Sequence, residues 1–283
     1  MRSVSKFLYR SYVAIGDSLS EGLGDFDFDA SRCGRGWADR LAGLLALEAD
    51  QHQEEFFFGN YALRGGGMLE ILTAQLEDAL KAKPDLVTIM AGSNDIMCRR
   101  SKHSALESLL RGAISRLLDA GCHVLVVNTI HPTHLRVFRP MARKARVMSQ
   151  LIERVSAEFG VPVLDLFSMN EFSNLKFWSE DMVHFSGHGH IRVANKAADL
   201  LGLSSRIEEF DESQMAAPQR SLWHTLRWLW VYVLPFWGRR LRGASSGDGL
   251  NPKHLEPVQM ICNPGERIVS LVATQTSSVA YVV

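Results

Sequence analysis

Apolar residues along the first two hundred positions form short runs that alternate with longer segments of helical periodicity. The short runs, predicted to be strands, cover residues 12–15, 56–58, 86–90, 124–127 and 161–164. The helical segments between them cover residues 37–48, 68–81, 105–119, 142–159 and 188–201. Gly121 and Gly160 each stand before a strand, where a glycine that ends a helix is expected. The alternation predicts a three-layer α/β/α sandwich with a five-stranded parallel sheet.

The regular alternation ends near Leu203. An acidic stretch, a Trp-rich apolar run at 222–237 and a basic run at 239–242 follow, and the tail from about residue 259 has no recognisable pattern. We therefore divide the chain into a domain over residues 1–203 and a C-terminal helical or irregular appendage over residues 204–283.

The Trp-rich run resembles an amphipathic helix. Apolar residues that share one helical face are Leu222, Leu226, Leu229 and Val233. The run is too short for a membrane span, and His224, Arg227 and Pro235 interrupt it. Four tryptophans and the basic residues after them suggest peripheral membrane contact through residues 222–242. A helix that covers the main domain or an oligomer interface is the favoured alternative.

Composition narrows the class of protein. The 283 residues are 46% hydrophobic, enough for one sizeable core, and the formal net charge of +0 provides no general attraction for nucleic acid. The four cysteines, Cys33, Cys98, Cys122 and Cys262, are far apart and form no CxxC pair, which argues against a zinc knuckle or a disulfide scaffold. Arg10 interrupts the apolar N-terminal run and no cleavage site follows it, so we expect a cytoplasmic protein.

A Gly-Asp-Ser tripeptide, residues 16–18, directly follows the first predicted strand. The carboxyl ends of strands are where α/β proteins gather ligands and catalytic groups, so Ser18 is a candidate nucleophile. A small residue before the serine permits a sharp turn that exposes the serine hydroxyl. The backbone N–H that follows can then face a developing oxyanion. The tripeptide alone is equally consistent with a serine or aspartate that caps a helix.

Two further loops follow the second and third predicted strands. In the first, Gly65 of Asn60-Tyr61-Ala62-Leu63-Arg64-Gly65 can bring a backbone N–H close to a ligand. In the second, the amide of Asn94, within Gly-Ser-Asn-Asp at 92–95, is a suitable oxyanion donor. Taken one at a time, the first loop is explained equally well by an ordinary loop glycine, and the second by an ordinary turn.

Asp181 and His184 lie three residues apart, beyond the last predicted strand. An aspartate can orient an imidazole so that its other nitrogen accepts a proton from a serine. The chain contains ten histidines, so an Asp-x-x-His spacing also arises by chance.

The four blocks, in this order, resemble those of the SGNH hydrolases, also called GDSL esterases and lipases. The resemblance extends over about residues 12–201 and selects Gly65 from three consecutive glycines. The segments at 239–243 and 245–249 also resemble the tails of actinobacterial members.

The resemblance implies a carboxylic ester hydrolase with a flavodoxin-like fold. It implies that Ser18 is the nucleophile, that Asp181 and His184 complete the triad, and that Ser18, Gly65 and Asn94 form the oxyanion hole. A small or lipid-like ester is the expected substrate, with an acyltransferase or a carbohydrate O-deacetylase as alternatives on the same site. Residues 1–203 would then be the catalytic domain.

No cofactor is expected, because the triad needs neither an organic group nor a metal. A metal site built from His184, His188 and His190 is disfavoured, because His188 and His190 would point to different faces of a helix and no partner ligands are evident.

Overall fold

The computed structural model of the protein describes residues 9–25, 35–97, 102–209, 222–234, 246–262, 268–272 and 279–282. Cys33, Cys98 and the basic run at 239–242 lie outside the described residues. In the part of the chain that is described, no helix is long and apolar enough to cross a membrane.

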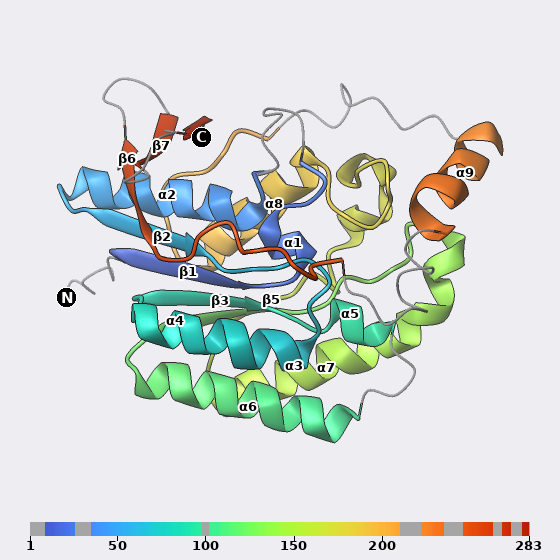
Figure 1. The fold of residues 1–283 in the computed structure, drawn as a ribbon, viewed down its shortest axis with the longest axis horizontal. Coiled ribbons are helices and arrows are strands. Elements are labelled where there is room, and N and C mark those ends of the chain that lie inside the picture. Colours follow the sequence, from blue (N-terminus) through green and yellow to red (C-terminus); the bar gives the residue numbers. More distant parts are fainter. Residues whose placement is uncertain are drawn as a thin grey trace.

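A single mixed sheet forms the centre of the molecule, and five parallel strands make up its first part (Figure 1). In chain order they are β1 (Ser11–Gly16), β2 (Phe56–Asn60), β3 (Leu86–Met90), β4 (His123–Val127) and β5 (Val163–Leu164). The spatial order is β5-β4-β3-β1-β2, so the strand order reverses between β1 and β3. Such a switch point opens a crevice at the carboxyl ends of the two strands. The five predicted parallel strands are confirmed.

Helices cover both faces of this sheet (Figure 1). One layer contains α2 (Trp37–Gln51) and α8 (Gly187–Leu200), and the other contains α3 (Met68–Glu70), the π-helical turn η1 (Ile71–Gln75), α4 (Leu76–Ala82), α6 (His103–Asp119) and α7 (Ala142–Glu158). Gly121 and Gly160 end α6 and α7 at φ values of 85° and 64°, as their positions predicted. The three-layer α/β/α sandwich is confirmed.

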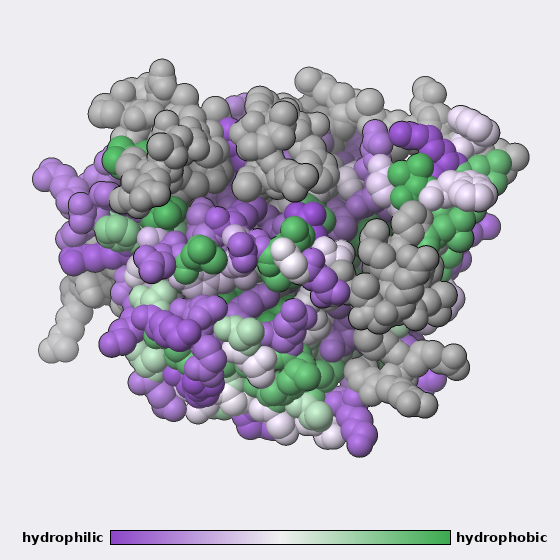
Figure 2. Space-filling view, in the orientation of Figure 1, coloured by the Kyte–Doolittle hydropathy of each residue, from purple (hydrophilic) through white to green (hydrophobic). Residues whose placement is uncertain are grey.

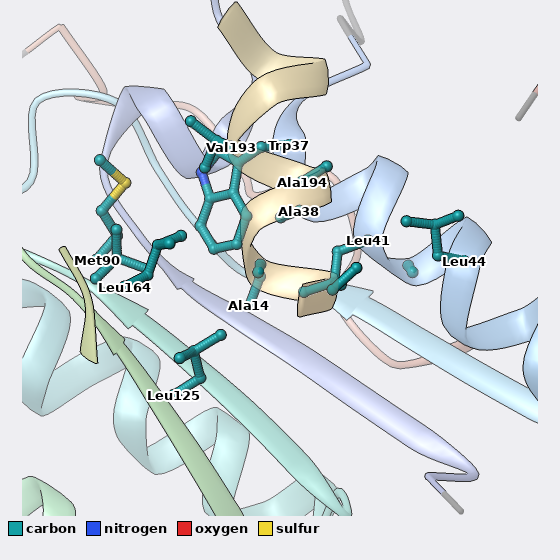
Figure 3. Packing of buried hydrophobic residues seen from close by; sticks show 14 of the residues in the cluster. Ala14, Trp37, Ala38, Leu41, Leu44, Met90, Leu125, Leu164, Val193 and Ala194 are labelled. Carbon is teal, nitrogen blue, oxygen red and sulfur yellow. The ribbon is translucent and has the colours of Figure 1, made fainter. Parts of the chain in front are cut away.

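Side chains alternate between the two faces of each strand, and this alternation divides the core into two clusters. Tyr12 and Ala14 of β1 pack in the cluster beneath α2 and α8, whereas Val13 and Ile15 pack in the cluster of the opposite layer. Trp37, fully buried at the start of α2, lies between α8 and the sheet in Figure 3. Because strands buried on both faces need apolar residues throughout, they appear in the sequence as continuous apolar runs.

Short elements connect the layers near the carboxyl ends of the strands. They are α1 (Ser18–Glu21), α5 (Ser93–Ile96), and the 3-10 helices η2 (Arg136–Met141), η3 (Asn170–Ser173) and η4 (Leu175–Phe177). At the same end of the molecule stand α9 (Leu222–Trp228) and the π-helical turn η5 (Leu229–Val233) that continues it (Figure 1).

Three antiparallel strands extend the sheet beyond β2, which the sequence pattern did not predict. They are β6 (Val258–Cys262), β7 (Ile268–Val272) and β8 (Val279–Val282), in the order β2-β6-β7-β8. Residues 258–260 of β6 pair with residues 56–58 of β2. Of these three described strands, β6 is the one that pairs with a parallel strand, so the tail adds to the edge of the sheet and leaves its centre unchanged. The domain boundary at residue 203 stays a prediction.

Candidate active site

Ser18 opens helix α1, where the chain turns sharply after β1. The carboxylate of Asp17 caps this helix by accepting the N–H of Leu19 at 3.0 Å. Gly16 has no room for a side chain, because a Cβ there would lie 2.9 Å from the carbonyl oxygen of Met90. The sequence therefore produces a tight turn that leaves Ser18 half-buried at the end of β1.

The amide of Gln75 holds this turn from the helical layer that contains α4, α6 and α7. The N–H of Gly16 donates to Gln75 Oε1 at 2.8 Å, and Gln75 Nε2 donates to the carbonyl oxygen of Gly16 at 3.0 Å. Gln75 ends the π-helical turn η1, and π-helical turns occur often at functional sites. No sequence signal pointed to this residue, because its partner is a backbone group distant along the chain.

His184 and Asp181 complete a chain of hydrogen bonds to Ser18. The Ser18 Oγ lies 2.8 Å from His184 Nε2, and His184 Nδ1 lies 2.5 Å from Asp181 Oδ2. A carboxylate only accepts, so Nδ1 carries the ring proton and Nε2 accepts from the serine hydroxyl. The structure thus brings together the three side chains predicted as a triad, in the order nucleophile, base and acid.

Asp181 is oriented by three further hydrogen bonds to its Oδ1. They come from the backbone N–H groups of Val183 and His184 at 2.9 and 3.0 Å and from the Ser179 hydroxyl at 2.7 Å. Burial raises the pKa of Asp181, but its interaction with the His184 ring and its hydrogen bonds from the His184 N–H and the Ser179 hydroxyl outweigh burial, so the pKa lies well below its usual value. Asp181 is therefore ionised whenever the protein is folded near neutral pH.

Gly65 and Asn94 lie beside Ser18, where the sequence placed the oxyanion hole. Both residues line one cavity with Ser18. Gly65 adopts φ 81°, a left-handed conformation that favours glycine. Asn94 is held by a hydrogen bond from its Nδ2 to the carbonyl oxygen of Gly66 at 2.9 Å. All five residues predicted for the site therefore converge on one place.

The cavity at this place has a volume of about 570 Å³. Its apolar wall contains Val137, Phe138, Met141, Trp228, Leu229 and Tyr232. The triad lines the remaining side together with Arg64 and Ser246. An apolar cavity with a few convergent polar groups is the usual form of a small-molecule site.

Residues 14–192 match the model of the GDSL-like lipase/acylhydrolase family. The chain belongs to this family. It is a carboxylic ester hydrolase, as its membership of this family shows. No curated protein sequence matches the chain.

Solved structures share the fold of this GDSL-like acylhydrolase at low sequence identity. The acetylxylan esterase Axe2 from Geobacillus stearothermophilus is 22% identical with a TM-score of 0.56, over 68% of this chain and 94% of that one. LAE5, an α/β hydrolase enzyme from the metagenome of Lake Arreo, is 19% identical with a TM-score of 0.58, over 69% and 96%. EstA, a psychrotrophic esterase from Pseudoalteromonas sp., is 15% identical with a TM-score of 0.50, over 67% and 95%.

The acylhydrolase buries a second carboxylate, Asp17, next to the candidate nucleophile. Its Oδ2 lies 3.5 Å from Asn94 Nδ2. Burial raises the pKa of Asp17 to about 6, although the hydrogen bond from Leu19 and the charge of His184 act against this shift. A carboxylate at this position places negative charge close to the predicted oxyanion hole.

An ion pair fixes the loop of the acylhydrolase that carries Gly65. Glu21 Oε2 accepts the backbone N–H of Arg64 at 2.7 Å, and Glu21 Oε1 accepts the Arg64 Nε at 2.9 Å. The guanidinium of Arg64 is engaged by Glu21. The pair joins α1 to the neighbouring loop, so Ser18 and Gly65 are positioned together.

Helix α9 of the acylhydrolase also contacts the predicted triad. The indole Nε1 of Trp228 donates to the carbonyl oxygen of Asp181 at 2.7 Å. The Trp228 ring packs edge-on against Phe138, with centroids 6.3 Å apart. The sequence showed the amphipathic character of this segment, but it contains no signal for a contact with a residue so far back along the chain.

His190 has a structural place in the core of the acylhydrolase. Its Nδ1 accepts the N–H of Trp37 at 3.1 Å, and its Nε2 donates to the carbonyl oxygen of Leu23 at 3.0 Å. Burial lowers the pKa of His190 to about 3, so the ring is neutral. Both ring nitrogens are engaged, which removes His190 from the alternative metal set. Among the described residues, no cluster of three or more potential metal ligands occurs.

Proposed function

We propose that this enzyme cleaves carboxylic esters through an acyl-enzyme on Ser18. His184 takes the hydroxyl proton of Ser18 as the oxygen attacks the ester carbonyl, and Asp181 stabilises the resulting imidazolium. The N–H groups of Ser18 and Gly65 and the amide of Asn94 would hold the oxyanion. His184 then protonates the departing alkoxide, and water releases the acyl group by the same sequence of steps.

The continuous hydrogen bonds from Ser18 through His184 to Asp181 carry this proposal. Distances of 2.8 and 2.5 Å are those of a base that is ready to accept the serine proton. The apolar wall of the cavity favours a lipid-like ester over a strongly polar one.

Labelling with a fluorophosphonate probe tests the nucleophile. We expect Ser18→Ala to abolish labelling and to lower kcat about 10⁶-fold, because no covalent intermediate can form. Ser20→Ala is a matched control two residues away, since the buried Ser20 hydroxyl has no hydrogen-bond partner among the described residues. Equal labelling of wild type and Ser18→Ala would refute the assignment.

Two alternatives use the same site and differ in the substrate. An acyltransferase would label at Ser18 but release product only when an acceptor alcohol is added. A carbohydrate O-deacetylase would cleave acetylated xylo-oligosaccharides, the type of substrate that the description of an Axe2 mutant as an acetyl-xylooligosaccharide esterase indicates for that protein. We favour simple ester hydrolysis, because the wall that faces Ser18 is apolar.

A second proposed property is contact with a lipid surface through α9 and η5. Trp223 and Trp230 are each 72% exposed, and Leu226, Val231 and Leu234 are exposed beside them. Figure 2 shows hydrophobic residues gathered at the end of the molecule where Figure 1 places α9. Tryptophan rings are well suited to the boundary between water and lipid. The same segment lines the active-site cavity, so this contact would bring lipid esters to Ser18.

Sedimentation with phosphatidylcholine vesicles tests this contact. The double variant Trp223→Ala, Trp230→Ala is expected to bind vesicles at least about tenfold more weakly, because two exposed aromatic rings no longer enter the interface. Leu255→Ala is the control, since Leu255 is also 72% exposed but lies outside α9 and η5. Equal binding by all three proteins would contradict the proposal.

A further inference from the structure

Two cavities meet at Ser18. Beside the cavity of about 570 Å³ lies a smaller one of about 140 Å³. Residues that line both are Ser18, Asn94, Met97, Phe138, Met141 and Val183. An ester attacked by Ser18 would therefore have space on two sides.

The positions of the catalytic groups decide which part of the ester lies in which cavity. A tetrahedral carbon on Ser18 carries an oxyanion, a leaving oxygen and an acyl chain. His184 must reach the leaving oxygen to protonate it, and His184 lines only the larger cavity. Gly65, the predicted oxyanion donor, also lines only the larger cavity. The smaller pocket is left for the acyl chain.

The smaller pocket is lined mainly by apolar side chains. Its walls include Leu19, Ile96, Ile130 and Trp178. The Trp178 indole donates to the carbonyl oxygen of Phe172 at 2.8 Å and stacks on His134 with centroids 3.7 Å apart. A wall held in this way cannot easily move aside for a longer chain.

We propose that this pocket is the acyl site and that it limits the acyl chain to about six carbons, while the larger cavity takes a bulky apolar alcohol. The inference rests on the proposed acyl-enzyme mechanism. A dry apolar cavity of about 150 Å³ holds a benzene molecule, which has six carbons, so the 140 Å³ pocket has a similar capacity. The alcohol site is larger and is covered by Trp228, Leu229 and Tyr232.

The chain-length profile of p-nitrophenyl esters tests the acyl site. From acetate to hexanoate, kcat/KM should rise by up to about fourfold for each methylene that enters the pocket. From octanoate to dodecanoate it should fall at least about tenfold below the hexanoate value, because the extra carbons have no space. An optimum at ten or more carbons would overturn the assignment.

Variants of Ile130, which lines only the smaller pocket, test its role directly. Ile130→Trp should move the optimum to acetate, and Ile130→Ala should move it to about eight carbons. If the bulky variant does not fold, the alanine variant still tests the shift. An unchanged optimum in a folded variant would overturn the proposal.

Leu229→Ala is the matched variant for the alcohol site, because Leu229 lines only the larger cavity. It should keep the acyl optimum and reduce the preference for naphthyl acetate over ethyl acetate about threefold or more. A shifted acyl optimum in Leu229→Ala would reverse the assignment of the two cavities. Failure of the mechanism itself is distinguished by Ser18→Ala: if that variant still hydrolyses the esters, the proposed function is wrong, whatever the chain-length profile.

Discussion

Asp17 combines two opposing effects in one side chain. Its carboxylate caps α1 through Leu19, and the cap is best when the group is charged. The same group is fully buried close to Asn94, and burial raises its pKa to about 6. The folded protein therefore binds this proton more tightly than the unfolded chain does. The contribution of Asp17 to stability falls as pH rises between the ordinary value of 3.8 and about 6.

Replacement of Asp17 by asparagine should remove this dependence while keeping an oxygen to cap α1. The unfolding free energy of Asp17→Asn relative to wild type is expected to increase from pH 4 to about pH 6 and then level off, with a total gain of about 3 kcal/mol at most. Urea unfolding of both proteins at a series of pH values measures this difference in unfolding free energy.

Asp165→Asn is a control with the opposite sign. Burial raises the pKa of Asp165, but hydrogen bonds from Ser168 and Asn128 outweigh it and lower the pKa. The wild type should therefore gain stability over this variant as pH rises. A pH-independent difference between Asp17→Asn and wild type would show that Asp17 has an ordinary pKa in the folded protein.

Single residues differ in how far the sequence reveals them. Ser18 and the Asp181–His184 pair were predicted because their chemistry and their places after strands are visible in the sequence. Gln75 and Glu21 were not, because each acts on the site through a backbone N–H group that any residue could supply. The positioning residues become visible only when the fold brings these backbone groups to them.

At the scale of elements, α9 joins the site through Trp228, while Trp223 of α9 and Trp230 of η5 are exposed. The segment therefore has features of both sequence-based interpretations: a helix that covers the main domain and a helix with interfacial tryptophans. Periodicity predicted an amphipathic helix here, but periodicity does not say what each face contacts.

Trp228→Phe tests the coupling between α9 and the triad. It keeps an aromatic ring in the cavity and removes the hydrogen bond to the carbonyl oxygen of Asp181. The net value of such a bond is about 0.5–1.5 kcal/mol, so we expect kcat to fall by about two- to tenfold on a soluble short-chain ester without lipid. Trp223→Phe should leave kcat unchanged, because Trp223 is exposed. Equal rates for both variants would mean that α9 does not position Asp181.

At the scale of the whole molecule, the C-terminal segment covers the β2 edge of the parallel strands. Met260 of β6 is buried against the core, and His254 Nδ1 accepts the N–H of Asn60 at 2.9 Å. Lys253 Nζ lies 2.7 Å from Asp39 Oδ2, with both side chains buried. The five parallel strands were predictable because each is a continuous apolar run, whereas β6 forms by pairing with a distant strand. The tail sequence alone carries no comparable signal.

Lys253→Met should destabilise the enzyme by about 3–5 kcal/mol, because it leaves the buried Asp39 carboxylate without the charge that compensates it. Thermal and urea unfolding measure the change. Lys81→Met is the control, since the Lys81–Asp78 pair is exposed and should contribute less than about 1 kcal/mol. Equal stability of the two variants would show that the C-terminal segment contributes little to the fold.

The contact of Lys253 and His254 with α2 and β2 has a consequence for biosynthesis. A ribosome completes Ser18 first, Asp181 and His184 more than 160 residues later, and Lys253 and His254, which contact Asp39 and Asn60, later still. Ser18 is therefore synthesised long before His184, and β2 is synthesised long before β6, the strand that pairs with its outer edge. A nascent chain that ends before residue 184 would carry the proposed nucleophile without the proposed base, so hydrolysis at Ser18 would require at least residues up to His184.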